Sequence, residues 1–561
     1  MNKTCTKSKG ARWLLLVALL TGFVAIGVVE SHRAGPTYDE PDYVYSGLAA
    51  LQRGELDVNA EHPPVFKVVA ALPELFDAPA LPSLAQALRA ARLSREESPQ
   101  TAETSLGQGD EYAYADALTR TLVTERKLRS VMFEARLIPL LLCAAVGLAL
   151  YWLTAALWGG GAGLFAAALW LASPLVLGAG ALDGVDVPFA LSAVLFARAL
   201  LGWVRAPERV SRLCLLGLAG GLAALANIDG LVLGALAIAL ILALRRDVKR
   251  ALLVALVIWA TLWLPYLLLD PGGLSPALLP GPYVAGVRYL LVHDSGADSY
   301  LLGVAWHGYR WSYLPLSLIV KLAPGTLLLL LAATPCWLWA SRRNREVLVS
   351  ICGPMLVLGV TEMTIGRDIG VRYTLPLVAL WCAGAGALIP AAGRLRTTWL
   401  RWLAHAALAA ALASAALATV ASIPNSLAYS DPLFGAPYRV ATNSSVDWGQ
   451  DFYALVRWSK SHPGARIAYF GPQGLGVWDF NRARRLLGVS PSRVVGWVAV
   501  SATDLTTGPS LAWLRAYCPI AVIDETLLIY RFEMPPTDAP GPVEPAAACP
   551  NRRFSVRAGA A

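Results

Sequence analysis

Long apolar runs dominate the first 422 residues of the chain. A helix needs about 20 such residues to cross roughly 30 Å of hydrocarbon. The first run covers residues 13–29, and the others lie at residues 137–157, 163–181, 187–204, 213–227, 230–244, 251–269, 313–340, 346–362, 374–391 and 402–422. The pattern predicts a polytopic α-helical membrane protein with about eleven transmembrane helices in residues 1–422.

Short basic clusters separate many of these runs. They lie before the first run and within residues 205–212, 245–250, 342–345 and 394–401. Because Lys and Arg are retained on the cytoplasmic side, the predicted crossings place every cluster and the N-terminus in the cytoplasm. No small-x-small cleavage site follows the first run, so we interpret it as an anchor. The 213–244 run divides into two spans only because both its ends are basic, and a count that differs by two stays open.

Because each crossing moves the chain to the other side of the membrane, the same count predicts which segments lie outside the cytoplasm. They are the first loop (31–136), residues 182–188, 270–313 and 361–376, and the tail from residue 423. In the tail, WGQDFYALVRWSKSHPG and PSLAWLRAYCP are typical of helices, whereas ARIAYFG, RVVGWVAVSA, IAVI and TLLIYRFE are typical of strands. We therefore expect a small extracytoplasmic α/β domain at residues 423–535. A flexible end rich in Pro and Ala is predicted at residues 536–561.

Composition supports the membrane prediction. The chain is 56% hydrophobic and 15% charged, whereas soluble domains carry about 25% charged residues. The net charge of +9 comes largely from basic residues in the clusters between apolar runs, which indicates topology and no nucleic-acid partner. Cys518 and Cys549 lie in a polar region and could form a disulfide if that region is outside the cytoplasm.

Two adjacent carboxylates, Asp39 and Glu40, stand just beyond the first run in TYDEPDYVYSG. A solvated loop or a helix cap explains them equally well on adjacency alone. Their context favours a catalytic role. Tyr38 and other aromatic residues flank them. The following stretch, EHPPVFKVVAALP, resembles a helix on the membrane surface that begins at Pro-Pro, with His62 before it and Lys67 at its polar edge. A carboxylate that is partly desolvated there has a raised proton affinity and is a better general base.

Other polar residues stand at predicted membrane boundaries. Asp183 and Asp186 flank one span three residues apart, and capping of the next helix is the favoured alternative to substrate binding. Lys321 is predicted deep within the 313–340 run, where a cation needs an anionic partner. Arg136 and Arg372, like Arg367, lie at the outer rim, where single cations are more often interface anchors.

Motifs for soluble cofactors are absent from the sequence. It contains no Walker A loop, no GxGxxG after a strand, no HExxH and no GxSxG, so no nucleotide cofactor is expected. His62 and His307 could join the acids in binding a divalent metal, but no compact ligand spacing favours this.

Several segments together resemble a known family. YDEPDYVYSG, EHPPVFKVVAALP, ARLIPLL and SPLVLGAGALDGVDVPFAL are similar to the first half of membrane glycosyltransferases of the GT-C fold, family 39. That family includes dolichyl-phosphate-mannose protein mannosyltransferases and bacterial aminoarabinose transferases. IGRDIGVRYTLPLVAL and SVDWGQDFYALVRW resemble bacterial members with a periplasmic C-terminal domain. The resemblance covers most of the chain and implies a multi-pass protein of the bacterial inner membrane.

The resemblance implies transfer of a sugar from a polyprenyl-phosphate carrier to an acceptor protein, lipid or polysaccharide on the outer face. A polyprenyl phosphate leaves as a stable anion, so the reaction needs a base and cations but no acid at the leaving oxygen. By position, Asp39 would be the base of an inverting transfer and Glu40 its support. Lys321 and Arg372, then Lys67 and Arg136, would hold the phosphate. Asp186, Asp183, His62 and Tyr38 would contact sugar or acceptor.

The sequence also departs from the family. Asn227 stands where many relatives have the lysine of a Thr-Lys pair, and ATNSSVDWGQD replaces an Asp-Ser-Asn sequence before DWGQD. The donor sugar is therefore not specified. A transporter or flippase for a lipid-linked sugar is the competing hypothesis, although no inverted repeat supports it. A structural envelope protein is the third.

Overall fold

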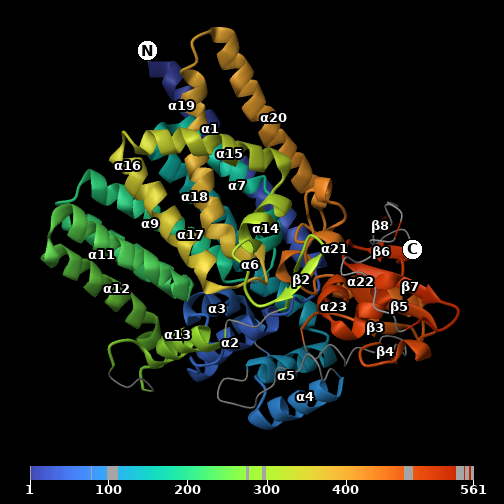
Figure 1. Cartoon of the computed structure of the whole chain (residues 1–561). Coiled ribbons are helices and arrows are strands. Elements are labelled where there is room, and N and C mark those ends of the chain that lie inside the picture. Colours follow the sequence, from blue (N-terminus) through green and yellow to red (C-terminus); the bar gives the residue numbers. More distant parts are fainter. Residues whose placement is uncertain are drawn as a thin grey trace.

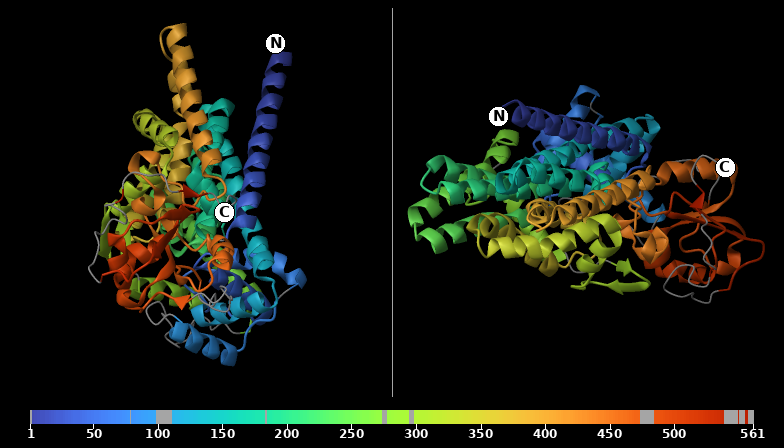
Figure 2. Two further views of the ribbon diagram at one scale, coloured as in Figure 1. Left: turned by 90° about the vertical axis from the view of Figure 1, so that its right-hand side faces the viewer. Right: turned by 90° about the horizontal axis from the view of Figure 1, so that it is seen from above.

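The computed structural model describes residues 2–77, 79–97, 111–182, 184–272, 277–293, 298–472, 484–537, 549 and 555–556. Helices form a bundle from which the N-terminal helix and helix α20 project, and a smaller domain with a sheet packs at the opposite end (Figure 1). The two further views show the same separation (Figure 2).

Nine helical segments among the described residues are long and apolar enough to cross a membrane. They are α1 (Asn2–Arg33), α6 (Leu128–Trp158), α9 (Asp186–Arg205), η2 with α11 (Ile228–Arg245), α12 (Val248–Leu269), α15 (Pro324–Ser341), α16 with η3 and α17 (Arg345–Ile365), η4 with α18 and α19 (Val371–Gly393), and α20 (Thr398–Ser422). The pair α7 (Gly160–Leu171) and α8 (Pro174–Gly180), bent by 67°, is a tenth. The shorter apolar helix α10 (Val210–Ala226) brings the number of candidate crossings among the described residues to eleven, which agrees with the number predicted from the sequence.

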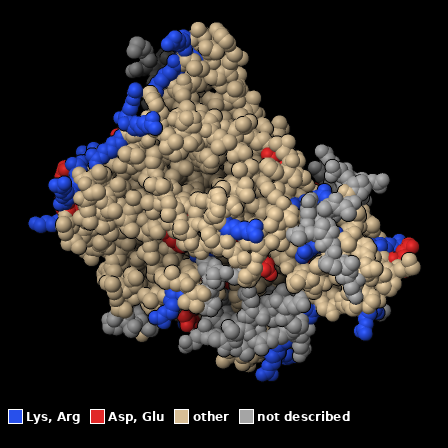
Figure 3. Space-filling model, viewed as in Figure 1, with Lys and Arg blue, Asp and Glu red and all other residues tan. Residues whose placement is uncertain are grey.

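Charged side chains are unevenly distributed over the molecular surface. On the face that Figure 3 shows, many Lys and Arg side chains lie along the upper left edge, and a broad area between this edge and the opposite side carries few charges. That area has the composition of a lipid-facing surface.

The predicted span at 313–340 is broken in the structure. Helix α14 (Tyr313–Lys321) ends before Ala323, and α15 begins at Pro324. Ala323 has φ −57° and ψ 142°, because a residue before proline is pushed out of the helical region. Lys321 therefore ends a separate short helix, and its predicted position deep within one continuous span is wrong.

The first loop folds into a helical layer at one end of the bundle (Figure 1). It contains α2 (Glu40–Arg53), α3 (Pro64–Ala71), η1 (Pro73–Asp77), α4 (Leu84–Glu97) and α5 (Glu111–Thr124). Helix α3 begins at the Pro-Pro pair, as predicted. A short hairpin of β1 (Asp298–Leu301) and β2 (Val304–His307) follows α13 (Gly281–His293) later in the chain.

The C-terminal domain contains a six-stranded mixed sheet in the order β4-β3-β5-β7-β6-β8. Its strands are β3 (Arg466–Ala468), β4 (Arg484–Arg485), β5 (Gly496–Ser501), β6 (Ala521–Ile523), β7 (Leu527–Phe532) and β8 (Ser555–Val556). Strand β5 pairs parallel with β3 and antiparallel with β7, and α22 (Phe452–Ser461) and α23 (Ala502–Thr507) accompany the sheet. Alternate residues of β5 and β7, including Val498, Val500, Leu528 and Tyr530, form the core.

Two short pieces of the predicted flexible end contact this domain. Strand β8 pairs parallel with β6, and Cys549 forms a disulfide with Cys518. Most of the remainder of residues 536–561 lies outside the described part of the chain.

Candidate functional site

Arg372 is the centre of a cluster that joins three distant segments. It lies in η4 (Val371–Thr374), and its Nη2 donates to Oδ2 of Asp39 across 2.9 Å. Its Nε lies 3.6 Å from Oδ2 of Asp186, the first residue of α9. The guanidinium carbon lies 4.0 Å from the ring centre of Trp448, in the DWGQD segment. The structure thus brings Asp39, Asp186 and Arg372 together.

The guanidinium of Arg372 has unused hydrogen-bond donors. Its Nε and Nη1 are buried and have no hydrogen-bond acceptor in the described part of the chain. Buried polar atoms without a partner are uncommon in native structures and call for an explanation such as a missing ligand. Arg372 can therefore offer the N–H groups of two further nitrogens, Nε and Nη1, to a bound group.

Asp39 is the half-buried N-terminal residue before α2, and its backbone oxygen accepts from the amides of Asp42 and Tyr43. The Tyr43 hydroxyl lies 3.3 Å from Oδ2 of Asp39 and 3.5 Å from Nε2 of His62. Burial and the nearby Asp39 raise the pKa of Tyr43 well above its ordinary value, so its phenol stays protonated. Burial and nearby cations lower the pKa of His62, which keeps its ring neutral.

Glu40 and Arg136 form a buried ion pair, and neither residue lines the cavity that contains Arg372. Nε and Nη2 of Arg136 each donate to one carboxylate oxygen across 2.6 Å. The same guanidinium donates to the carbonyls of Ser31, Ala34 and Gly35. These bonds use all five N–H donors of an arginine, so Arg136 has none left for a phosphate. The pair instead fixes the segment between α1 and α2, and through it the position of Asp39.

The two candidate lysines are also engaged by backbone oxygens. Nζ of Lys67 donates to the carbonyl of Asn59 across 2.6 Å and to two further oxygens of Val58 and Asn59. Lys67 is buried and does not lie at the polar edge of α3, contrary to the sequence prediction. Nζ of Lys321 donates to the carbonyls of Leu427 and Tyr429. Each lysine therefore fixes a loop next to the cluster.

Two further sequence candidates are Tyr38 and Asp183. Tyr38 donates its amide to the carbonyl of Trp448 and stacks on Phe470 at 5.2 Å, so it joins the first loop to the C-terminal domain. Asp183 lies outside the described residues.

Sequence reasoning missed a second buried ion pair and the role of Trp448. Nη1 of Arg367 donates to Oδ2 of Asp229 across 2.8 Å. Asp229 stands in NIDG at the start of η2, where the Asn227 side chain accepts from its amide. An acid between two apolar runs was the available signal. For Trp448, the aromatic residue inside the SVDWGQD motif was the signal.

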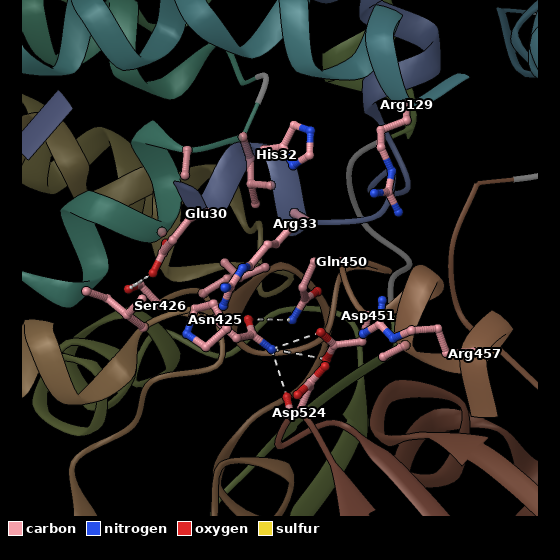
Figure 4. Close-up of a pocket in the computed structure, with 18 residues that line it drawn as sticks. Glu30, His32, Arg33, Arg129, Asn425, Ser426, Gln450, Asp451, Arg457 and Asp524 are labelled. Atoms are coloured by element: carbon pink, nitrogen blue, oxygen red, sulfur yellow. Dashed lines mark hydrogen bonds between the residues drawn. The ribbon is translucent and has the colours of Figure 1, made fainter. Parts of the chain in front are cut away.

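A cavity of about 480 Å³ opens beside the cluster, between the end of α1, residues 423–427 and the C-terminal domain. Arg33, Arg129 and Arg457 reach it from three different segments (Figure 4). The Asp451 carboxylate, whose pKa is raised by burial and by Asp524, accepts from Asn425 at its floor. Leu182 and Leu427 line both this cavity and the small cavity that contains Asp186 and Arg372.

Metal-ligand geometry is not found in the described part of the chain, where no group of three or more His, Cys, Asp and Glu side chains converges. His307 pairs with Asp298 at 2.9 Å on the exposed hairpin, away from His62.

Among known proteins, solved structures resemble the fold of this chain, whereas family models and curated sequences do not match it. The chain is similar to ArnT from Cupriavidus metallidurans bound to undecaprenyl phosphate (15% identity, 92% of this chain and 97% of that chain, TM-score 0.45). Its apo state gives 14% identity, 93% and 98% coverage and a TM-score of 0.48. The apo oligosaccharyltransferase of Archaeoglobus fulgidus gives 12% identity, 89% and 71% coverage and a TM-score of 0.45.

At identities of 15% or less and TM-scores below 0.5, these neighbours do not extend any activity to this chain.

Proposed function

We propose that this protein is a membrane glycosyltransferase that moves a sugar from a polyprenyl-phosphate carrier to an acceptor hydroxyl on the outer face of the membrane. The observation that carries the proposal is the contact between Asp39 and Arg372, with two buried guanidinium donors of Arg372 unused. The cluster lies at the first residue of α9, where an apolar segment meets the first loop. A lipid-linked donor and a water-borne acceptor can both reach that boundary.

The chemistry of the donor matches this set of groups. When the bond between the anomeric carbon and the phosphate oxygen breaks, the phosphate keeps the electron pair as a stable anion. The free Nε and Nη1 donors of Arg372 would hold its oxygens by charge-assisted hydrogen bonds. Such donors, fixed before the reaction begins, stabilise charge in the transition state without reorganisation.

Asp39 is the proposed general base. It would take the proton of the acceptor hydroxyl as the acceptor oxygen attacks the anomeric carbon from the side opposite the phosphate, which inverts that carbon. The phenol of Tyr43 and Nη2 of Arg372 both contact Oδ2, so they orient the carboxylate and leave Oδ1 for the acceptor. Asp186 would contact hydroxyls of the sugar or the acceptor.

The cavity of about 480 Å³ is the proposed acceptor entrance. It adjoins the cluster through Leu182 and Leu427 and is bordered by the C-terminal domain. We therefore assign acceptor recognition to residues 423–535, with a protein, a lipid or a polysaccharide as the acceptor class. The Cys518–Cys549 disulfide supports an extracytoplasmic domain, because such bonds persist outside the reducing cytoplasm. A multi-pass protein of the bacterial inner membrane with a cytoplasmic N-terminus fits this arrangement.

The test uses the purified protein in lipid nanodiscs with polyprenyl-phosphate sugars and measures release of polyprenyl phosphate. We expect wild type to release it and Asp39→Asn to be slower by about 10²–10⁴-fold, the usual contribution of a general base. Asp57→Asn is the matched control, because Asp57 is an exposed carboxylate of the same loop. Unchanged release in Asp39→Asn would remove Asp39 as the base. Movement of a labelled lipid-linked sugar across the bilayer, with no release from any donor, would favour the flippase.

A further inference from the structure

A lipid-facing groove runs along α9 and α10 on the membrane side of the bundle. Its volume is about 650 Å³. Helix α9 contributes Pro188, Leu191, Leu195 and Arg198, and α10 contributes Arg212, Leu215, Leu218 and Leu222, with Phe66 of α3 and Trp152 of α6 beside them. These positions recur at three- and four-residue intervals, so each helix presents one face to the groove.

Two arginines close one end of this apolar groove. Arg198 and Arg212 are half-buried and have no hydrogen bond or ion pair within the described part of the chain. Their Nη1 atoms lie 3.7 Å and 3.1 Å from the point that a Cβ on Gly202 would occupy, so the two guanidiniums converge over this glycine. Arg205, on the same helix, differs because Glu346 neutralises it. Two converging cations without an anion repel each other, and an anion between them would remove that cost.

We propose that this groove binds one anionic phospholipid of the cytoplasmic leaflet, with the phosphate between Arg198 and Arg212 and an acyl chain along the α9–α10 face. From Arg198 to Pro188 the groove covers ten residues of α9, about 15 Å at helical rise. One leaflet contributes about half of the roughly 30 Å hydrocarbon core. The groove therefore has the length of one acyl chain, and its charged end lies on the side of the basic clusters.

The phosphate of the polyprenyl-phosphate donor cannot be the anion that Arg198 and Arg212 bind. Asp186, which contacts Arg372, precedes Arg198 by twelve residues on α9, about 18 Å. One phosphate cannot reach both ends, and a polyprenyl tail carries no second anion. The donor phosphate therefore leaves the charged end of the groove empty, and the test of the phospholipid site needs no glycosyl transfer.

The experiment is native mass spectrometry of the intact protein after exchange into phosphatidylglycerol or phosphatidylcholine with identical chains. We expect wild type to retain one phosphatidylglycerol and Arg198→Gln/Arg212→Gln to retain about tenfold less or lower, the loss of charge-assisted hydrogen bonds. The matched control is Arg245→Gln/Arg246→Gln at the end of α11, which removes the same charge from exposed arginines. Equal retention by the two double variants would overturn the site.

Two further arms identify the occupant. Leu218→Trp fills the groove at an already exposed position and leaves both arginines in place, so it should lose phosphatidylglycerol even if the double arginine variant does not fold. Retention in Leu218→Trp would remove the acyl-chain groove from the proposal. Equal retention of phosphatidylcholine by wild type would show that charge is not recognised. One-for-one displacement of phosphatidylglycerol by polyprenyl phosphate would replace the phospholipid as occupant.

Discussion

Arg372 reaches Asp39 across 333 positions of sequence, and its Nη2 lies 2.9 Å from Oδ2 of that carboxylate. The contact connects the first loop to the segment just before α18. The ring of Trp448, in the tail that follows the last span, stacks on the same guanidinium. The arrangement orients the Asp39 carboxylate before any substrate arrives. It also leaves two donors of the same arginine for a second anion.

Removing the planar fork of Arg372 should slow the reaction more than removing one unit of charge elsewhere. We expect Arg372→Gln to lower the turnover of polyprenyl-phosphate release by about 10²–10³-fold, the loss seen when a donor to developing negative charge is removed. Arg372→Lys should fall between Arg372→Gln and wild type, because an ammonium keeps the charge without the fork. The control is Arg343→Gln, an exposed arginine that stacks on Trp339. If Arg372→Gln turned over like this control, Arg372 would not hold the donor phosphate.

The buried ion pair of Glu40 and Arg136 should contribute much more to the stability of the fold than an ion pair at the surface does. Glu40→Gln leaves the buried Arg136 guanidinium without its counter-ion, which costs about 3–5 kcal/mol. The pair of Arg205 and Glu346 is partly exposed, and Glu346→Gln should cost about 0–1 kcal/mol. Thermal unfolding in detergent, followed by tryptophan fluorescence, measures the difference. Equal melting temperatures for the two variants would show that the buried pair does not hold the first loop.

The apolar pattern predicted the crossings, because hydrophobicity is a local property of the sequence. The DE motif drew attention to Asp39, which the structure places against Arg372, and its role as a base stays a prediction. The roles of Arg136, Lys67 and Lys321 could not be predicted, since their partners are backbone carbonyls or a carboxylate brought close only by the fold. The break before Pro324 could have been predicted from the sequence, because a residue that precedes proline is pushed out of the helical region. The pairing of Asp229 with Arg367 needed the spatial contact of two segments 138 positions apart.

Asp504 should make the stability of the C-terminal domain depend on pH. Burial, with a contribution from Asp447, raises the pKa of Asp504 from 3.8 to about 7, and its Oδ2 has no hydrogen-bond partner among the described residues. The folded state therefore holds a proton that the unfolded state releases above pH 3.8, so stability falls as the pH rises from about 3.8 to about 7 and then levels off.

Asp504→Asn mimics the protonated carboxyl and should remove this dependence. We expect the variant to melt higher than wild type at about pH 8.5 and by a clearly smaller margin at about pH 5, as judged by thermal unfolding at both values. Asp57→Asn, at an exposed position, is the control. The same shift at both pH values would show that the effect is one of packing and not of ionisation.

The Cys518–Cys549 disulfide gives a direct test of orientation. If the C-terminal domain lies outside the cytoplasm, a membrane-impermeant maleimide applied to cells with a permeabilised outer envelope should label neither cysteine until an external reductant is added. Arg246→Cys, at the end of α11 among the basic clusters, should stay unlabelled until the inner membrane is opened, whereas Asp57→Cys in the first loop should react at once. Labelling of Cys518 that requires an opened inner membrane but no reductant would place the domain in the cytoplasm. Tyr38, next to Asp39, donates its amide to the carbonyl of Trp448 in the tail. The first loop therefore lies on the same side as the C-terminal domain, and that result would also remove the outer-face acceptor from the proposed reaction.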